Sequence, residues 1–244
     1  MLVAGCSHSA GSEIDGTDDS AYNREHSFGN QLAKIRGYTP VNIAISGHSN
    51  PAIARSVLDW FDRCYDSESM DVFVCVGWTE SIRVDCPSPY QINYRDWNAS
   101  VDHYTDDHNN FLQVNAGWAG NNYAEQRIIP YWQDFQVRQP VSLELISINA
   151  VLQLQYFFKM HGVDYIMCNT MHMFTTPCEH LDFYIKLVHR KKYYGMLDNS
   201  LGFFWHYRNR GYENPKAKYW HHGEQAHLEH AHVLNELIEN PKVT

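Results

Sequence analysis

Apolar positions in the first third of the chain form short continuous runs that are separated by helical stripes. Residues 2–4, 41–45 and 71–76 are apolar runs without two-residue alternation, which is typical of strands covered on both faces. Between them, apolar side chains recur at helical spacing: Phe28, Leu32 and Ile35, and then Ile53, Val57, Trp60 and Cys64. This alternation of strand and helix predicts a parallel sheet with right-handed crossovers.

Glycine and proline mark where these elements begin and end. Gly37 follows the first helical stripe, at a position typical of a helix C-terminus. Asn50 and Pro51 precede the second stripe, and a capping residue before a proline predicts a helix start. Gly5 and Gly47 follow the first two apolar runs, so we expect each strand to end in a tight turn.

The second half of the chain continues the pattern. A helical stripe ends near Gly162, an apolar run at 163–168 predicts another strand, and 203–207 is a further candidate strand. A closing helix is expected from Glu224. The apolar positions of these two helices are Leu143, Ile146, Ala150, Leu154 and Phe157, and then Ala231, Leu234 and Ile238. The pattern predicts one domain over residues 1–244, a three-layer α/β/α sandwich around a parallel sheet.

Residues 83–141 interrupt the pattern after the third predicted strand. They show no helical or strand period and are rich in asparagine, aspartate and aromatic residues. Because a structureless loop of this length is rare inside a compact domain, we expect a small subdomain or a lid over the carboxyl edge of the sheet. Aromatic and amide side chains together suit a carbohydrate or aromatic ligand. Alternatively, they pack the insertion's own core.

Composition excludes several classes of function. A net charge of −9 argues against nucleic acid as the main partner, because binding phosphates requires a basic surface. No apolar run approaches 18 residues, so we expect no membrane span. The first residues show neither a basic segment nor a long apolar stretch, so no export signal is expected. These features favour the cytoplasm, and they indicate no oligomeric state.

The cysteines and histidines indicate no metal site. The six cysteines contain no C-x-x-C pair, so reduced thiols are expected and a zinc ribbon is not. Five histidines between residues 221 and 232 suggest a metal enzyme as a rival class, but H-E-x-x-H is absent. His227 shares a stripe with Ala231 and Leu234, which favours a packed core residue over a ligand. We therefore predict neither a metal nor a cofactor.

Three turns carry the candidate chemistry, since the carboxyl ends of parallel strands share one edge of the sheet. Their sequences are GCSHS (5–9), SGHSN (46–50) and GWTE (77–80). Ser7 offers a hydroxyl nucleophile, and Gly47 lets a backbone N–H approach a substrate oxygen closely. Thr79 offers a further donor. A nucleophile with two or three donors suits acyl transfer, where negative charge develops on the carbonyl oxygen.

A serine nucleophile needs a base, and the segment before the closing helix supplies candidates. It is YWHHGEQAH (219–227), in which His221 is the preferred base and His222 its rival. Cys6 precedes Ser7, but adjacent residues leaving a strand point to opposite sides. A buried structural cysteine is therefore favoured over a thiol nucleophile.

The order of these motifs resembles the SGNH (GDSL-like) hydrolase superfamily across nearly the whole chain. Gly5-Cys6-Ser7 is similar to its first block, residues 42–47 to its second, GWTE to its third, and His221 with His227 to its last. GCSHS, GWTE-x-x-R and HHGEQAH resemble a subgroup common in phage and environmental bacteria. The resemblance implies a flavodoxin-like sandwich, oxyanion donors at Ser7 and Gly47, and no cofactor.

Two departures from the family pattern affect the site. Thr79 stands where the family has an oxyanion asparagine. Tyr219 and Lys218 stand where a carboxylate is expected before the base. We therefore predict a Ser7–His221 dyad, with the second ring nitrogen bonded to a backbone carbonyl, water or a carboxylate from elsewhere. The candidate carboxylates are those of Glu224, Glu80 and Asp198.

Two further residues are candidate substrate contacts. Arg83 either clamps an anionic group of the substrate or pairs with Asp85, and Trp78 lies in the same third turn. The prediction is a serine ester hydrolase working through an acyl-enzyme, with a small-molecule or carbohydrate O-acyl ester as substrate. The alternative is a binding or structural protein that has kept the fold without the chemistry, for example a component of a phage particle.

Overall fold

The computed structural model describes residues 1–87, 111–115, 130–131, 133–135, 137–171, 173 and 179–241. The two candidate contacts of the third turn, Trp78 and Arg83, are within these ranges. Most aromatic residues of the 83–141 insertion are outside them, as is Cys178. The ligand-binding role expected of those aromatics, and the subdomain or lid, stay predictions.

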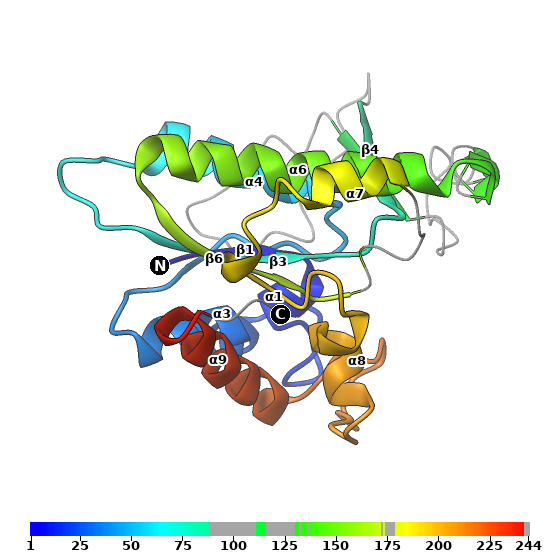
Figure 1. Ribbon diagram of the computed structural model, residues 1–244. Helices are drawn as coiled ribbons and strands as arrows, with labels where there is room; N and C mark the ends of the chain where they lie inside the picture. The colour runs from blue at the N-terminus through cyan, green and yellow to red at the C-terminus, as the bar shows by residue number, and fades with distance from the viewer. Residues whose placement is uncertain are drawn as a thin grey trace.

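The main helices and strands follow the predicted alternation (Figure 1). The strands are β1 (Leu2–Gly5), β2 (Val41–Asn42), β3 (Phe73–Trp78), β4 (Arg83–Pro87), β5 (Phe111–Asn115), β6 (Asp164–Asn169) and β7 (Tyr193–Tyr194). The helices are α1 (Ser7–Ala10), α2 (Ala21–His26), α3 (Phe28–Ile35), α4 (Asn50–Cys64), α6 (Pro140–His161), α7 (Glu179–Ile185), α8 (Phe203–Arg208) and α9 (Glu224–Glu239), with 3₁₀ turns at Arg190–Lys192 and Asn199–Leu201.

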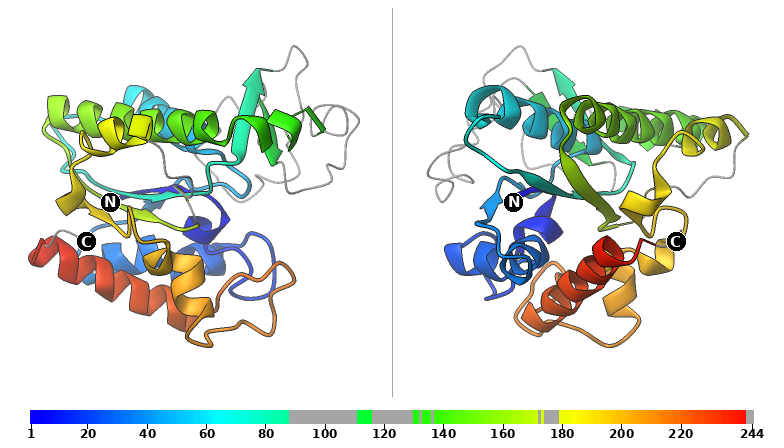
Figure 2. Two further views of the ribbon diagram at one scale, coloured as in Figure 1. Left: turned by 45° about the vertical axis from the view of Figure 1, so that its right-hand side comes forward. Right: turned by 60° about the vertical axis from the view of Figure 1, so that its left-hand side comes forward.

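Five strands form one parallel sheet in the order β2-β1-β3-β6-β7. This is the flavodoxin-like order, in which the first strand lies beside both the second and the third. Helices α4 and α6 cover one face, and α3 and α9 cover the other (Figures 1 and 2). The predicted three-layer α/β/α sandwich is confirmed.

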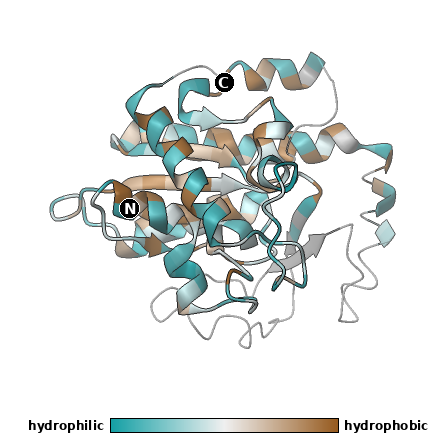
Figure 3. Cartoon of the chain, turned by 90° about the horizontal axis from the view of Figure 1, so that it is seen from below, coloured by the Kyte–Doolittle hydropathy of each residue, from teal (hydrophilic) through white to brown (hydrophobic). Residues whose placement is uncertain are grey.

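Two hydrophobic clusters, one on each face, hold the layers together. Side chains at alternate positions of one strand enter opposite clusters: Leu2 and Ala4 pack toward α4 and α6, and Val3 packs toward α3 and α9. All six residues of β3 are buried, as expected for a central strand with helices on both sides. Viewed from below, hydrophobic and hydrophilic colours alternate along the helices (Figure 3), consistent with one buried face on each.

Helix ends agree with the sequence signals to within a residue. Helix α4 is capped by Ser49, whose side chain accepts a hydrogen bond from the N–H of Ala52, so the cap lies one residue before the predicted Asn50. Gly37, with a φ of 73°, follows the end of α3. Gly162 ends α6 at a φ of 65°.

One predicted strand is wrong. Residues 203–207 form helix α8, and the fifth strand of the sheet is the two-residue β7. Phe203, Phe204 and Tyr207 are the buried positions of α8, and their i, i+1, i+4 spacing is helical. A short aromatic run by itself does not distinguish a helical period from a strand period.

Three positions of the predicted stripes are exposed. Ile146 on α6 is 38% exposed, Ile35 at the end of α3 is 37% exposed, and Cys64 at the end of α4 is exposed. Helix α6 instead buries Ile148, Val151 and Phe158 beside the predicted Leu154. The stripe is broader than predicted because α6 packs against both α4 and the sheet.

Helix α6 is also long and apolar enough, by length and composition, to cross a membrane, which the absence of an 18-residue apolar run did not lead us to expect. Within its most apolar window, 56% of the residues are buried inside the molecule. Helix α6 packs against α4 and the sheet, and its apolar residues are explained by this packing as those of a core helix.

The described part of the insertion contains a strand pair that the sequence pattern did not predict. Strands β4 and β5 pair antiparallel and are separate from the main sheet, with Arg83 opposite Asn115. Asp85, in β4, bonds to Ser49 and Arg55 of the α4 region, which ties the root of the insertion to the sandwich.

The first turn is held against the sheet by a close approach between a serine and two glycines. Ser9 of α1 lies where side chains on Gly5 and Gly77 would be, at the paired carboxyl ends of β1 and β3. A Cβ on Gly77 would also lie 2.8 Å from Cγ2 of Thr170, and Gly5 has a φ of 154°, which side chains rarely adopt. These two glycines let α1 pack directly onto the sheet.

We therefore expect Gly77→Ala to lower the free energy of unfolding by about 1–3 kcal/mol, the usual cost of overpacking. Chemical denaturation measures the change. Gly223→Ala is the matched control, because its new Cβ would meet nothing closer than 3.8 Å and its φ is −80°. Equal free energies of unfolding for Gly77→Ala and Gly223→Ala would show that Ser9 moves away from the new Cβ without cost.

Candidate active site

The candidate nucleophile stands where the first strand turns into a helix. Strand β1 ends at Gly5, and Ser7 is the first residue of α1, at the carboxyl edge of the sheet. Ser7 is mostly buried, with 7% of its surface exposed. Cys6 is completely buried, with its Sγ 3.3 Å from Oγ1 of Thr170, which agrees with the structural role predicted for it.

The second turn lies beside the first. Gly47 has a φ of 85° in a turn closed by the N–H of His48 and the carbonyl of Ile45, and no atom lies within 4 Å of where its Cβ would be. The hydroxyls of Ser46 and Ser12 are 2.9 Å apart and join the two turns. This open, side-chain-free position suits a backbone donor that a substrate oxygen approaches.

The candidate base is bonded to a carboxylate from the other end of the chain. Nδ1 of His221 lies 2.7 Å from Oε2 of Glu13, and the Glu13 side chain is 2% exposed. The same carboxylate accepts hydrogen bonds from the backbone N–H groups of Lys218, at 2.8 Å, and Tyr219, at 2.9 Å. Glu13 thus orients the imidazole and also fixes the segment that carries it.

Of the three predicted partners of the second ring nitrogen, a backbone carbonyl, water or a carboxylate from elsewhere, the structure shows the carboxylate, but all three named carboxylates are wrong. Glu224 accepts from the Tyr22 hydroxyl, Glu80 from Arg83, and Asp198 from Ser200. Glu13 lies in a loop with no periodic pattern, and it reaches His221 across 208 positions. Only the three-dimensional fold brings the two side chains together.

Backbone strain coincides with this pair. Among the described residues other than glycine, Glu13 and Trp220 have positive φ angles, of 65° and 68°. Left-handed backbone is costly for side chains of this kind and concentrates at functional sites. One strained residue is the carboxylate itself, and the other directly precedes His221.

Ring contacts place the nucleophile turn next to the base. The ring centroid of His8, which follows Ser7, lies 4.8 Å from that of His221. His8 is 5% exposed and also contacts Phe203 and Phe204 of α8. Ser7, Glu13 and His221 therefore lie in one small region at the carboxyl edge of β1.

The electrostatics of the pair suit proton transfer. Burial alone would raise the pKa of Glu13, but hydrogen bonds from His221, Tyr219 and Lys218 outweigh it and hold that pKa below its ordinary value. Burial lowers the pKa of His221, and this effect exceeds the opposing hydrogen bond and charge of Glu13. Near neutral pH the pair is thus an ionised carboxylate and a neutral imidazole, the state that a general base requires.

His222, the rival base, is committed to a structural role. It is 2% exposed, with Nδ1 2.7 Å from the carbonyl oxygen of Tyr212 and Nε2 2.8 Å from that of Phe204. Both ring nitrogens face backbone acceptors, so neither is open to a serine hydroxyl. This geometry favours His221 over His222 as the base.

The next histidines along the chain pack within the fold. His227 is buried and its Nδ1 accepts the N–H of Phe28 at 3.1 Å, which fixes the start of α3 on α9. This agrees with the core role predicted for it. His230 is buried among aromatic rings that include Phe28 and Phe203.

Thr79 and Trp78 are not open to a ligand in this structure. Thr79 is completely buried, and its backbone N–H and carbonyl both bond to the side chain of Asn50. Its hydroxyl has no hydrogen-bond partner among the residues that the structure describes. Trp78, predicted as a substrate contact, is completely buried in the core between the sheet and α4 with α6, because β3 is central and covered on both faces.

Arg83 pairs with Glu80 and not with Asp85. Its Nη2 lies 2.9 Å from the Glu80 carboxylate, while Asp85 bonds to Arg55 and Ser49. The positive charge of Arg83 contributes, after burial, to lowering the pKa of His8 and of His221. The rival explanation, in which Arg83 pairs with Asp85, is therefore wrong.

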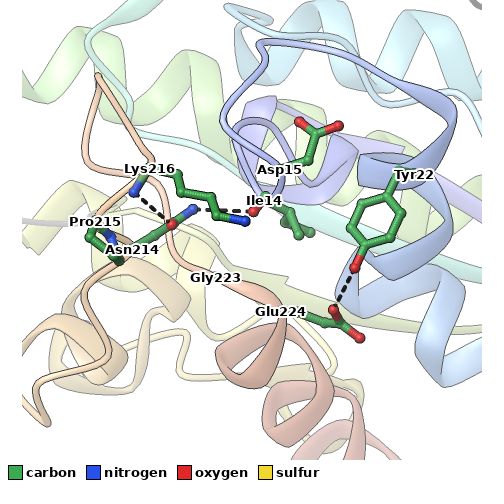
Figure 4. Close-up of a pocket in the computed structure, with 8 residues that line it drawn as sticks. All are labelled: Ile14, Asp15, Tyr22, Asn214, Pro215, Lys216, Gly223 and Glu224. Atoms are coloured by element: carbon green, nitrogen blue, oxygen red, sulfur yellow. Dashed lines mark hydrogen bonds between the residues drawn. The ribbon is translucent and has the colours of Figure 1, made fainter.

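A pocket of about 480 Å³ has lining residues that are close in sequence to Glu13 and His221, among them Ile14 and Gly223 (Figure 4). It includes neither Ser7 nor Gly47, so it is separate from the nucleophile. Tyr22 and Glu224 close one side through a hydrogen bond of 2.9 Å. Its lining residues are Ile14, Asp15, Tyr22, Asn214, Pro215, Lys216, Gly223 and Glu224.

Comparison with known proteins gives structural neighbours only. No family model and no curated protein matches the chain. Solved structures that resemble it include a carbohydrate esterase family 2 enzyme with a carbohydrate-binding domain from Myceliophthora fergusii (TM-score 0.45, 12% identity), a carbohydrate esterase with catalytic and non-catalytic binding functions (0.42, 10%), and an acetyl xylan esterase from the rumen bacterium Butyrivibrio proteoclasticus (0.42, 12%).

These matches cover 97–99% of this chain but 64%, 68% and 63% of the three neighbours, in the same order. All three TM-scores are below 0.5 and all identities are 12% or less. The substrates of those enzymes are therefore not assigned to this chain, and its chemistry is argued from its own residues.

The Glu13–His221 bond makes a prediction for the ionisation of the base. An NMR titration should give His221 a pKa below the ordinary value of about 6.5. Because Glu13 raises that pKa against the effect of burial, Glu13→Gln should lower it further. Glu224→Gln is the matched control and should leave it unchanged, and His221→Asn assigns the resonance. An increase in the Glu13→Gln variant would contradict the arrangement.

Proposed function

We propose that this chain is a serine ester hydrolase of the SGNH type, with Ser7 as nucleophile, His221 as base and Glu13 as the acid that orients the base. The observation that carries the proposal is the 2.7 Å contact between Glu13 and His221, held by two further backbone donors. It supplies the function that the local sequence lacks, since Tyr219 and Lys218 occupy the family's acid positions.

In the proposed reaction, Nε2 of His221 takes the proton of the Ser7 hydroxyl while Oγ attacks the ester carbonyl carbon. The tetrahedral oxyanion accepts hydrogen bonds from the N–H groups of Ser7 and Gly47. The imidazolium then gives its proton to the departing alcohol, which leaves an acyl group on Ser7. Water, deprotonated by His221, then attacks the acyl carbon, the bond to Oγ of Ser7 breaks, and the imidazolium returns its proton to Oγ as the acid is released.

Glu13 fits the third role on physical grounds. Its carboxylate accepts from Nδ1, which fixes the tautomer that leaves Nε2 free to take a proton, and its charge stabilises the imidazolium when it forms. Backbone N–H groups of Lys218 and Tyr219 keep the carboxylate ionised although it is buried. We expect Thr79 to act as an oxyanion donor only if the turn around it opens, because its hydroxyl is buried.

For the substrate, we propose an O-acyl group on a carbohydrate. Arg83 supports a substrate with a polar or anionic part, since its positive charge acts on His221 and its side chain is 11% exposed. Aromatic residues in the insertion support a sugar on sequence grounds alone. No step of the proposed reaction requires a metal or an organic cofactor.

The nucleophile is tested with a fluorophosphonate probe, which labels only an activated serine. Mass spectrometry should find the adduct on Ser7, and Ser7→Ala and His221→Ala should both abolish labelling. Adduct on another residue, or labelling that survives in Ser7→Ala, would remove Ser7 from its role. A folded protein that is never labelled would favour the alternative, a binding or structural protein that has kept the fold.

The acid is tested by activity. Glu13→Gln should lower kcat for an aryl acetate by about 10²- to 10⁴-fold, the range seen when a triad carboxylate is replaced by an amide. The amide places a donor against the backbone N–H groups of Lys218 and Tyr219, so circular dichroism must confirm the fold. Glu224→Gln, near the base but outside the bond, should keep kcat within about twofold. Equal kcat values for Glu13→Gln and Glu224→Gln would show that Ser7 and His221 act as a dyad without Glu13.

A further inference from the structure

The residues before the candidate base are unusually exposed for aromatic side chains. Trp220 is 66% exposed and Tyr219 is 46% exposed, and both directly precede His221. Large apolar side chains on a surface are informative where they gather beside a functional site, because water solvates them poorly. The segment that carries the base therefore also presents an indole to the solvent.

The backbone explains why a turn exists here, but not why it contains a tryptophan. Tyr219 donates its N–H to Glu13, and His221 bonds to the same carboxylate through its ring, so the chain must bend sharply at Trp220. Trp220 takes up the bend with a φ of 68°. Glycine or asparagine adopts such an angle at lower cost, and tryptophan is among the most strained choices. The indole itself must therefore provide something that the turn does not require.

The indole is held in place by a cation. The guanidinium carbon of Arg208 lies 4.5 Å from the centroid of the Trp220 ring. Arg208 also lies over the rings of Phe204, at 5.5 Å, and Trp205, at 5.7 Å, so it joins the indole to helix α8. A cation stacked on one face orients the ring and leaves the remaining surface exposed.

A chain of ring contacts connects this indole to the catalytic region. Arg208 covers Phe204, the ring of Phe204 lies 5.6 Å from that of His8, and the ring of His8 lies 4.8 Å from that of His221. Trp220 is thus fixed to the same cluster of rings that surrounds the base, and it is adjacent to the base in sequence. A molecule that lies on Trp220 borders the region where an ester would react.

We propose that Trp220 is a stacking platform for a sugar ring, and that the ring belongs to the alcohol part of the ester. This inference rests on the proposed hydrolase for its link to the reaction, but sugar binding itself does not require catalysis. A sugar combines an apolar face, which stacks on an indole, with hydroxyl edges, which hydrogen-bond to the polar groups around it.

The surroundings favour a sugar over an apolar acyl chain. Arg208 stacks on Trp220, Lys218 lies over the ring of the adjacent Tyr219, and the pocket of Figure 4 contains Asp15, Lys216 and Glu224. A long acyl chain needs a continuous apolar groove, and these charged groups do not line one. An exposed planar ring on a polar rim fits a ligand that is itself polar at its edges.

The test measures binding in the Ser7→Ala background, where no ester chemistry occurs. Tetrasaccharides of β-1,4-linked glucose, xylose, mannose and N-acetylglucosamine are titrated while tryptophan fluorescence and calorimetry are recorded. We expect at least one of them to bind, and Trp220→Gly to weaken its affinity at least tenfold. Trp220→Phe, which keeps an aromatic face, should retain part of that affinity.

Two controls separate binding from folding. Trp220→Gly relieves the strained φ, so its melting temperature should stay close to that of the parent. Tyr156→Ala removes an aromatic side chain that is 45% exposed on α6, and it should not change sugar affinity. If no tetrasaccharide binds, or if Trp220→Gly binds as tightly as the parent, the platform is rejected.

The two proposals fail separately. Loss of sugar affinity in Trp220→Gly together with an unlabelled Ser7 would keep the platform and reject the hydrolase. Phosphonate labelling of Ser7 together with unchanged sugar affinity in Trp220→Gly would keep the hydrolase and reject the platform.

Discussion

The hydrogen bond between Glu13 and His221 is the constraint on which the site depends. A buried carboxylate is stable only when its charge is fully compensated, and Glu13 has three donors from one short segment, Nδ1 of His221 and the N–H groups of Lys218 and Tyr219. Asn214 adds a fourth restraint by donating to the Glu13 carbonyl at 2.6 Å. The segment 214–221 is therefore ordered around one carboxylate.

The sheet provides the other half of the geometry. Ser9 fits against the sheet because Gly5 and Gly77 have no side chains there, and this contact fixes the short helix that begins with Ser7. The hydroxyls of Ser12 and Ser46 then join the first turn to the turn that contains Gly47. Ser7, Gly47 and Glu13, the candidate nucleophile, oxyanion donor and acid, thus lie near one edge of the sheet. His221 is the member that must be brought to that edge from a distant part of the chain.

The sequence predicts well those features that local patterns encode. Continuous apolar runs identify β1, β3 and β6, because strands covered by helices on both faces have no polar side. The order of motifs around those strands also predicts Ser7, Gly47 and His221 as site residues, and their roles stay predictions. Local patterns fail at 203–207, where the helical period becomes clear only from the buried positions of α8.

Features that depend on distant contacts are beyond such patterns. Glu13 carries no periodic signal, and nothing near it indicates a partner 208 positions away. Trp78 belongs to a turn motif in the sequence, but its place at the end of a central strand buries it in the core. Ser49 replaces Asn50 as a helix cap because both residues are good caps, and Asn50 instead bonds to both backbone groups of Thr79.

The separation of Glu13 from His221 has a consequence for how the protein is made. The ribosome completes the sheet strands before it reaches residue 221, so the nascent chain carries Ser7 and Glu13 without the imidazole. Until then, the Glu13 carboxylate has no partner at residues 218–221, and its burial is unfavourable. Docking of that segment closes a loop of some 200 residues, a contact of high sequence separation that typically forms late. The candidate site is therefore incomplete until residues 218–221 have been synthesised and have docked against Glu13.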